Sequence, residues 1–414
     1  MTCVEFFSKA AIENVCTGLL QPPERVILIG DSQKLLQRQA ERYHELLARR
    51  GAAVEFICKA VNKNNLQSVV EELKAILATY EDCVFDLTGG EELYLVAMGM
   101  LYERNPAIQM HRFNLRNNSL LDCDMDGVTI AEHTMPQLTV AECVQLNGGE
   151  IIFDDVRAGA TRRWTWNEAL REDIDTLWEI CRRNVREWNI QTTVFAAAER
   201  FCSENDDPLV TVAPIPYLQD YLENAESGYV IFKRIISDLF DTGLLTYVDC
   251  NERYFMVAYK NETVKYCLQK AGQVLEMKIF SAACAAKEAD GSPTYHDVMT
   301  GVQLDWDGVI HAGGESFDTE NEVDVILMHG MIPVFVSCKN GAFTSEELYK
   351  LNTVAQRFGG PYAKKVLVAT ALNTACDAPD HLRQRAKDMN ICLVENLQEL
   401  DGKQLEKKVR SFWK

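Results

Sequence analysis

The sequence predicts an α/β protein in three segments, and three observations support this prediction. Near the N-terminus, short apolar runs alternate with amphipathic helical patterns, as in a parallel sheet with helical crossovers. The middle segment is rich in helix and closes with two apolar runs around a polar turn. The last segment combines helices with an apolar hairpin, which indicates a mixed α/β domain. A chain of 414 residues is too long for one core, so we expect domains at residues 1–157, 158–270 and 271–414.

The N-terminal segment has the element order of a Rossmann-like parallel sheet. We expect strands at residues 25–30, 53–58 and 83–87, and helices at residues 33–50, 64–80 and 91–104. In such sheets the strands end at one edge, and ligands bind beyond that edge. The loops Gly30-Asp31-Ser32 and Thr88-Gly89-Gly90 both lie there.

These two loops suit a ligand that carries phosphate groups. Each follows a strand and precedes a helix, so backbone N–H groups point out of the sheet edge. Their glycines allow a ligand to approach the backbone closely. Neither loop has the GxGxxG or the GxxxxGK[ST] pattern, so ordinary dinucleotide and triphosphate sites are not supported. The alternative is that Ser32 and Thr88 only cap the helices that follow.

The middle segment has the element order of a winged helix. Helical patterns at residues 164–188 and 228–241 precede apolar runs at residues 244–248 and 254–258, with a polar turn between these runs. Many winged helices bind DNA, but the second helical pattern carries only two basic residues where a recognition helix would lie. We therefore expect a structural connector or a dimerisation module.

The C-terminal segment contains the most informative stretch of the chain. Strands are expected at residues 298–306, 322–328, 333–338 and 365–369, and helices at residues 273–287 and 345–358. The hairpin formed by the second and third of these strands places Asp324 and Lys339 where they can meet at one end of the sheet. A carboxylate there can hold Mg²⁺ or Mn²⁺, and a lysine can orient water or offset the charge of a scissile phosphate.

Composition restricts the classes of function. The formal net charge of −19 excludes a general polyanion binder, so any nucleic acid must be held locally by a metal, a cleft or a few lysines. No run of about 18 apolar residues occurs and the first residues lack a signal-peptide pattern, so we expect a cytoplasmic protein with no membrane partner. The 14 cysteines include no CxxC pair, which favours reduced thiols over disulfides or zinc sites.

The N-terminal motifs resemble the CRISPR-associated Rossmann fold (CARF) sensor. The resemblance is carried by Val4-Glu5-Phe6-Phe7, Ile29-Gly30-Asp31-Ser32 and Asp86-Leu87-Thr88-Gly89-Gly90. It implies a homodimer that binds a cyclic oligoadenylate, in particular cyclic tetra-adenylate, across its two-fold axis. The ligand-binding residues that it implies are Gly30, Asp31, Ser32, Gln33, Asn62, Lys63, Thr88, Gly89, Gly90 and Glu91.

The C-terminal stretch resembles the restriction-endonuclease-like core of the PD-(D/E)XK nucleases. The resemblance implies catalytic roles for Glu276, Asp324, Ser337 and Lys339, with Mn²⁺ or Mg²⁺ bound by Glu276 and Asp324. Ser337 departs from the pattern, which has Asp or Glu two residues before the lysine, and Glu322 or a backbone carbonyl is left to compensate. Without this family context, Glu276 is equally well interpreted as a solvated helix residue.

The order of sensor, winged-helix-like connector and nuclease matches that of the single-sensor ancillary nucleases of type III CRISPR systems. It implies a metal-dependent endonuclease, activated by cyclic oligoadenylate, that cleaves single-stranded DNA or RNA or a nicked or locally opened duplex. One alternative is a non-catalytic regulator that responds to cyclic oligoadenylate and binds nucleic acid. The other is an unrelated enzyme that binds a small nucleotide in a Rossmann-like cleft.

Overall fold

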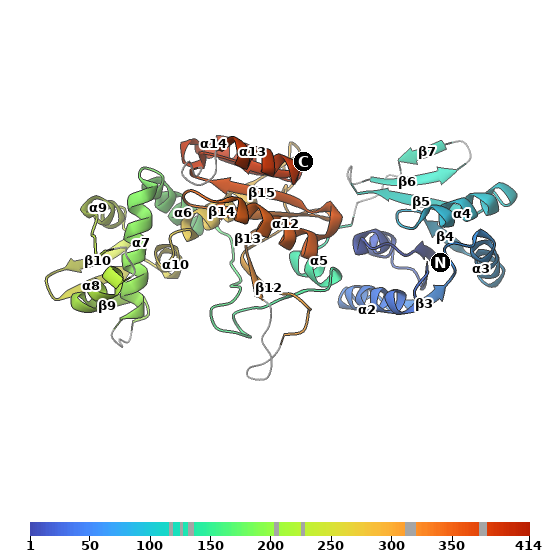
Figure 1. The fold of residues 1–414 in the computed structure, drawn as a ribbon, viewed down its shortest axis with the longest axis horizontal. Helices are drawn as coiled ribbons and strands as arrows, with labels where there is room; N and C mark the ends of the chain where they lie inside the picture. Colours follow the sequence, from blue (N-terminus) through green and yellow to red (C-terminus); the bar gives the residue numbers. More distant parts are fainter. Residues whose placement is uncertain are drawn as a thin grey trace.

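The computed structural model describes residues 1–115, 119–124, 127–130, 136–202, 207–224, 228–310, 320–371 and 379–414. Figure 1 shows an elongated molecule with a sheet at the N-terminal end, a second sheet at the centre and a mostly helical part at the other end. The predicted α/β class is confirmed, since the N-terminal sheet is largely parallel and the C-terminal sheet is mixed. In the described part of the chain, no helix combines the length and the apolar character needed to cross a bilayer.

The N-terminal sheet has the order β3-β2-β1-β4-β5-β6-β7, in which β1 to β5 run parallel. Its strands are β1 (Thr2–Phe6), β2 (Arg25–Gly30), β3 (Glu55–Ala60), β4 (Cys83–Asp86), β5 (Gln109–Asn114), β6 (Ser119–Asp124) and β7 (Gly127–Ile130). Its helices are η1 (Ala11–Asn14), α1 (Cys16–Leu20), α2 (Gln33–Arg49), α3 (Leu66–Thr79) and α4 (Glu92–Arg104). The order reverses direction between β1 and β4, and a parallel sheet opens a crevice for ligands at such a switch point.

The middle segment folds as predicted in outline but contains more elements. They are α6 (Glu168–Cys181), α7 (Val185–Arg200), β9 (Val210–Pro214), α8 (Ile215–Asn224), α9 (Lys233–Asp241), β10 (Leu245–Cys250), β11 (Tyr254–Tyr259) and α10 (Glu262–Leu268). The hairpin β10–β11 pairs with β9 in a three-stranded sheet, in keeping with a winged helix. The single helical pattern expected at residues 164–188 is wrong, because Asn184 ends the run by accepting a hydrogen bond from the Glu187 N–H and capping α7.

The C-terminal sheet has the order β16-β15-β14-β13-β12-β8. Its strands are β8 (Glu150–Ile151), β12 (Asp297–Asp305), β13 (Glu320–His329), β14 (Ile332–Lys339), β15 (Lys364–Ala369) and β16 (Ile391–Val394). The helices and turns around it are α5 (Val140–Leu146), α11 (Gln273–Ala285), α12 (Ser345–Gly359), η2 (Gly360–Tyr362), α13 (Pro379–Asp388), η3 (Leu397–Glu399) and α14 (Gly402–Arg410). The strand β8 pairs with β12, so residues 150–151 belong to the C-terminal sheet. The expected domain boundary at residue 157 had placed them with the N-terminal sheet.

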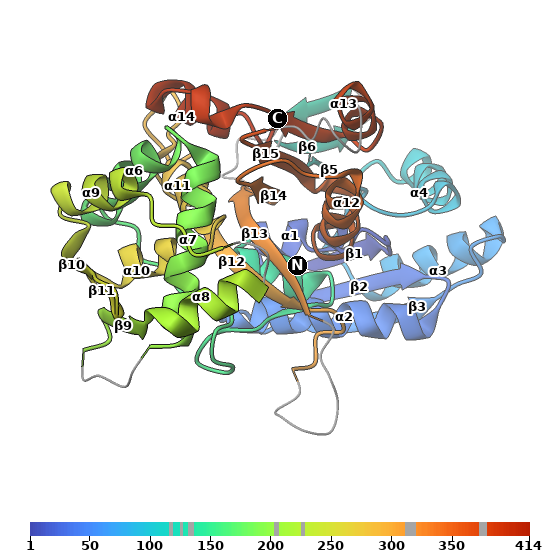
Figure 2. The ribbon, with the colours of Figure 1, turned by 60° about the vertical axis from the view of Figure 1, so that its left-hand side comes forward.

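The three parts are arranged in space in a different order from the sequence. Figures 1 and 2 show the C-terminal sheet between the N-terminal sheet and the middle segment. One buried apolar cluster combines Tyr43 and Leu46 of α2 with Phe335 of β14 and Leu351 of α12. The N-terminal and C-terminal domains therefore share a core, and the middle segment does not lie between them as a connector would.

Candidate functional site

Three carboxylates from two elements meet at one end of the C-terminal sheet. The register of the hairpin pairs Val325 with Val336, so Asp324 of β13 lies across from Ser337 of β14. Side chains two residues apart in a strand share a face, which brings Glu322 to the same side as Asp324. Glu276 comes from the first turn of α11. One carboxylate oxygen from each of these three acidic residues lies within 4.8 Å of the others.

Asp324 is held in place by the strand opposite it. The backbone N–H of Cys338 donates to Oδ2 of Asp324 at 2.6 Å, and the Ser337 hydroxyl donates to the same oxygen at 3.3 Å. Lys339 ends in an ion pair with Glu347 of α12, at 2.7 Å. The structure therefore brings Glu276, Asp324 and Ser337 together as predicted. Lys339 lies beside them, but its amine is paired with the carboxylate of Glu347.

The electrostatics of this cluster favour a bound cation. Glu276 is only 3% exposed, so its interpretation as a solvated helix residue is wrong. Burial, reinforced by the negative charge of Asp324, raises the pKa of Glu276 to about 8. Burial also raises the pKa of Asp324, against the N–H of Cys338 and the charge of Lys339, which lower it. Buried carboxylates that repel one another are relieved by a divalent cation, which takes oxygen ligands of this kind.

Glu322 supplies the third carboxylate, which sequence reasoning named only as one way to compensate for Ser337. Its Oε1 lies 2.9 Å from the Lys270 amine. Burial opposes the charged form of Lys270, but Glu276 and Glu322 outweigh it and raise the pKa of this lysine. The spacing of Glu322 and Asp324 could have predicted this third carboxylate, because residues two apart in a strand share one face.

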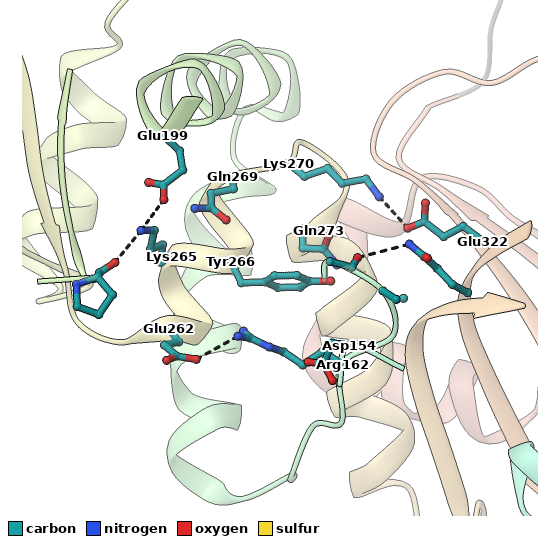
Figure 3. Close-up of a pocket in the computed structure, with 15 residues that line it drawn as sticks. Asp154, Arg162, Glu199, Glu262, Lys265, Tyr266, Gln269, Lys270, Gln273 and Glu322 are labelled. Carbon is teal, nitrogen blue, oxygen red and sulfur yellow. Dashed lines mark hydrogen bonds and ion pairs between the residues drawn. The ribbon is translucent and has the colours of Figure 1, made fainter. Parts of the chain in front are cut away.

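A cavity of about 620 Å³ extends from the middle segment to Glu322, at the edge of this cluster. Figure 3 shows Tyr266 of α10 at its centre, with Lys270, Gln273 and Glu322 at the side nearest β13. The Tyr266 ring packs against Trp164 at 5.0 Å between centroids. Four carboxylates and three cations line the cavity, so its wall carries no excess of positive charge: Asp154, Glu199, Glu262, Glu322, Arg162, Lys265 and Lys270.

The predicted sensor loops converge at the carboxyl edge of the N-terminal sheet. The Lys63 amine lies 3.0 Å from Asp31 and 2.9 Å from Glu91, so one side chain ties together the loops after β2, β3 and β4. Hydrogen bonds to Glu91 and Asp31 raise the pKa of Lys63. Ser32 stands at the N-cap of α2 but makes no capping hydrogen bond with its side chain, so the capping alternative fails there.

The remaining predicted sensor residues surround these three loops. Gly30 ends β2, and Gln33 begins α2 directly after Ser32. The side chain of Asn62 accepts a hydrogen bond from the Asn64 N–H at 3.1 Å within its own loop. Glu91 is the N-cap of α4 and makes no capping hydrogen bond with its side chain.

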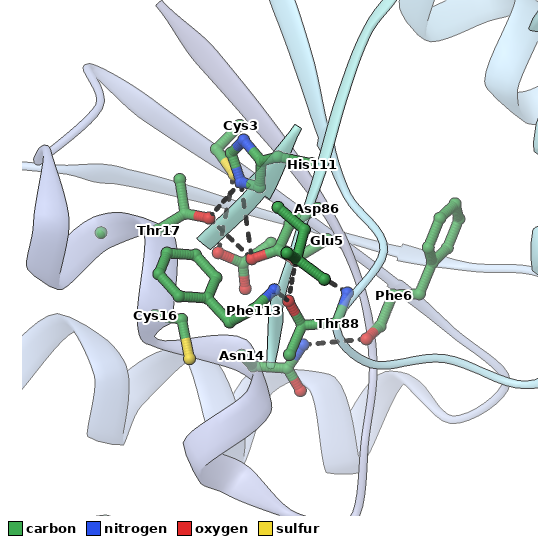
Figure 4. A network of polar contacts seen from close by, with 12 residues as sticks. Cys3, Glu5, Phe6, Asn14, Cys16, Thr17, Asp86, Thr88, His111 and Phe113 are labelled. Atoms are coloured by element: carbon green, nitrogen blue, oxygen red, sulfur yellow. Dashed lines mark hydrogen bonds and ion pairs between the residues drawn. The ribbon is translucent and has the colours of Figure 1, made fainter. Parts of the chain in front are cut away.

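Thr88 faces inward and stabilises its own loop. Figure 4 shows its hydroxyl beside Asp86, to which it donates, and the same oxygen accepts the Phe113 N–H at 2.8 Å. Thr88 therefore does not cap α4. Gly89 and Gly90 follow, and Gly90 has a φ of +108°. A Cβ on Gly90 would lie 2.6 Å from Cβ of Phe6, so the loop needs glycine at this position.

Sequence reasoning missed Ser8 and Lys9 as candidates for this edge. They follow β1, which is the strand at the switch point, and Lys9 is exposed. The N–H of Ser8 donates to the side chain of Asn14 at 2.8 Å. The acidic Glu5 interrupts the apolar run of β1, so the pattern alone did not predict a strand there, and the loop after it was not assigned to the edge.

Comparison with solved structures extends over the whole chain. Protein VC1899 from Vibrio cholerae matches with a TM-score of 0.70 and 17% identity, over 100% of this chain and 97% of that one. Can2 from Sulfobacillus thermosulfidooxidans, solved in complex with cyclic tetra-adenylate, matches with a TM-score of 0.66 and 15% identity, over 100% and 99%. No protein-family model and no curated protein matches the sequence. From end to end, the chain thus has the fold of VC1899 and Can2.

Proposed function

We propose that this protein is a metal-dependent nuclease of type III CRISPR defence that is activated by cyclic tetra-adenylate. The observation that carries the proposal is the cluster of Glu276, Glu322 and Asp324 beside Lys339, within a fold shared over its full length with Can2 in complex with cyclic tetra-adenylate. A carboxylate cluster can hold a divalent metal that promotes phosphodiester hydrolysis, and a neighbouring lysine can offset the charge of the phosphate.

Each residue of the cluster has a distinct part in this proposal. Glu276, Glu322 and Asp324 would hold Mn²⁺ or Mg²⁺, which would supply positive charge for the scissile phosphate and lower the pKa of a water molecule. The Cys338 N–H and the Ser337 hydroxyl fix the orientation of Asp324.

Lys339 is the residue that we assign to the phosphate. Its amine is held by Glu347, and we propose that it exchanges this partner for the substrate when the nuclease is activated. Its positive charge would then offset the charge that develops as water attacks phosphorus and the bond to the leaving oxygen breaks.

The sensor would control access to this centre. We propose a homodimer in which the loops after β1, β2, β3 and β4 of both subunits contact one cyclic tetra-adenylate molecule. Each subunit would supply the same donors to half of a symmetric ligand. A resting protein with a net charge of −19 has little long-range attraction for nucleic acid, so cleavage would depend on ligand-induced closure.

The test is a cleavage assay with and without the activator. The protein is incubated with Mn²⁺, labelled single-stranded DNA and RNA, and plasmid DNA, in the presence or absence of cyclic tetra-adenylate. We expect cleavage only when metal and activator are both present, and its loss in Asp324→Ala and in Lys339→Ala. The absence of cleavage under every condition would overturn the nuclease assignment.

Ser337 favours one second candidate, a regulator that binds nucleic acid in response to the ligand without cleaving it. This alternative predicts binding of cyclic tetra-adenylate and of nucleic acid with no cleaved product in the same assay. Binding of cyclic tetra-adenylate, but not of ATP or NAD, separates both candidates from an enzyme with an ordinary nucleotide cleft.

A further inference from the structure

A second cavity, of about 600 Å³, lies between the start of α7 and the carboxyl ends of β14 and β15. Arg182, Arg183 and Arg186 line it from the α6–α7 turn and the first turn of α7. Gly341 and Thr370 line it from the side of the C-terminal sheet. The described residues that line it include no Asp or Glu, which is unusual in a chain with a net charge of −19.

The three arginines are engaged to different degrees. Arg182 has a structural role, because it donates to the carbonyl oxygens of Gln398 and Leu400. Arg183 is half-exposed and forms an ion pair with Asp238 of α9 at 3.1 Å. Arg186 is exposed and has no carboxylate partner among the residues that the structure describes. Arg186 is therefore available to an incoming anion, and Arg183 could join it by exchanging Asp238 for that anion.

Three hydrogen bonds connect the lining of this cavity to the end of β14, beside the candidate nuclease centre. The Thr370 N–H donates to the carbonyl oxygen of Lys339 at 3.1 Å. The Asn189 side chain of α7 donates to the carbonyl oxygen of Asn340 at 2.5 Å, and the Asn340 side chain donates back to it at 2.9 Å. The cavity thus begins at Gly341, two residues beyond Lys339, at the same end of β14 as Ser337.

Two further features favour an anion in this cavity. Thr370 is 4% exposed, and its hydroxyl has no hydrogen-bond partner in the described part of the chain. The N-terminus of α7, a helix of 16 residues, also faces the cavity through Val185 and adds a partial positive charge. The 620 Å³ cavity on the other side of the cluster lacks this character, because carboxylates outnumber cations on its wall.

We propose that this arginine-lined cavity binds the phosphate backbone of the substrate strand, next to the phosphodiester bond that is cleaved. The inference rests on the proposed nuclease function and adds where the strand lies. The strand would pass from the carboxylate cluster along the end of β14 towards Arg183 and Arg186. The winged-helix surface around α9 would then have no part in holding it.

The experiment compares two double variants that each remove two positive charges from the same domain. Arg183→Ala/Arg186→Ala changes the cavity, whereas Lys233→Ala/Arg234→Ala changes exposed basic residues at the start of α9. Affinity for labelled single-stranded DNA and RNA is measured without added metal at several salt concentrations, with cyclic tetra-adenylate present. Cleavage is measured separately with Mn²⁺.

We expect Arg183→Ala/Arg186→Ala to weaken binding about 10-fold or more and to reduce the salt slope by roughly 0.7 for each phosphate that the variant no longer neutralises. Its melting temperature and its affinity for cyclic tetra-adenylate should match those of the wild type. Arg186→Ala alone, which breaks no ion pair within the described part of the chain, should show part of the same effect. Lys233→Ala/Arg234→Ala should bind and cleave as the wild type does.

The outcomes separate this inference from the function on which it rests. If the wild type cleaves and Arg183→Ala/Arg186→Ala binds and cleaves equally well, the cavity assignment is wrong and the nuclease assignment stands. If Lys233→Ala/Arg234→Ala loses as much affinity, the strand lies on the winged helix instead. If the wild type neither binds nor cleaves any strand, the proposed function fails and this inference fails with it.

Discussion

Ser337 occupies the position at which the nuclease pattern has a carboxylate, and the geometry around it shows how the site can be completed. Its hydroxyl lies 3.3 Å from Asp324, so it supports a neighbouring acid. The third carboxylate comes from Glu322, two residues before Asp324 on the same face of β13. With Glu276 and Asp324, Glu322 makes three carboxylates close enough to share one cation.

This arrangement predicts different effects for the two residues. Ser337→Ala should lower the cleavage rate by about 10-fold, the low end for a partner that only orients a ligand, because the Cys338 N–H still holds Asp324. Glu322→Gln should lower the cleavage rate further and should raise the Mn²⁺ concentration needed for the half-maximal rate, because it removes a charged ligand. Rates at a series of Mn²⁺ concentrations check both effects. A larger drop in Ser337→Ala than in Glu322→Gln would contradict the role assigned to Glu322.

Glu5 gives a prediction on stability that does not depend on the nuclease. It is 1% exposed, and it lies beside Asp86 on the neighbouring parallel strand. Burial and the charge of Asp86 raise its pKa well above the usual value. Tyr43 and Cys3 both donate to its Oε1, while its Oε2 has no hydrogen-bond partner among the described atoms.

The sign of the pH dependence follows from the raised pKa. The unfolded chain ionises Glu5 at a lower pH than the folded protein does, so stability is lost as the pH rises from the unfolded pKa towards the folded one. Glu5→Gln cannot titrate, and its melting temperature relative to the wild type should therefore increase from pH 5 to pH 8. Glu41→Gln, at an exposed position of α2, is the control and should show no such trend. Parallel melting curves for Glu5→Gln and the wild type across this range would contradict the raised pKa.

At the scale of elements, the sequence predicted the helices and strands whose own residues show a regular apolar pattern. The apolar runs of β2, β4 and β14 and the amphipathic face of α2 were correct to within a few residues, because burial on a regular period determines them. β1 was missed, since the buried Glu5 interrupts its apolar run. The two-residue strand β8 carries no pattern of its own and exists only by pairing with β12. Site residues were predictable on the same grounds. Asp324 and Lys339 lie on one hairpin, whereas Ser8 and Lys9 can be placed at the sheet edge only once the strand order is known.

The loop between β4 and α4 gives a prediction at this scale. Gly90 and Gly51 both have positive φ, so alanine should cost about 1–2 kcal/mol at either position. Only at Gly90 would the added Cβ also collide, with Phe6 at 2.6 Å, whereas nothing lies within 4 Å at Gly51. Gly90→Ala should therefore lower the melting temperature more than Gly51→Ala and should weaken binding of cyclic tetra-adenylate. Calorimetric titration of both variants checks this, and equal affinities would show that the loop does not contact the ligand.

For the whole molecule, the shared core is the feature that no local pattern could predict. The short segment of η1 and α1 contacts both the carboxyl ends of β1 and β4 and the C-terminal domain. On one side, Asn14 donates to the Phe6 carbonyl oxygen at 2.8 Å and Thr17 donates to Asp86 at 2.6 Å. On the other side, Cys16 Sγ lies 3.9 Å from Met331 Sδ, in the turn between β13 and β14. A change in the loop after β4 can therefore reach the hairpin that carries Asp324 without involving the middle segment.

A second contact of this segment provides the test of such coupling. The Tyr362 hydroxyl of η2 donates to Glu13 of η1 at 2.6 Å. η2 directly follows α12, whose Glu347 holds Lys339. If closure at the sensor moves α12 through this bond, Tyr362→Phe should reduce activation by cyclic tetra-adenylate about 5-fold or more. Its affinity for nucleic acid in the absence of the activator should stay unchanged.

The control is Tyr349→Phe, which removes an exposed hydroxyl from α12 and should be activated normally. Cleavage rates across a titration of the activator, for both variants and the wild type, make the comparison. Because the affinity of the activator and the state of the nuclease are linked, Tyr362→Phe should also change the binding constant of cyclic tetra-adenylate. Full activation of Tyr362→Phe with wild-type affinity would mean that the signal reaches the nuclease by another route, and the contact of Cys16 with the β13–β14 turn would then be the next to examine.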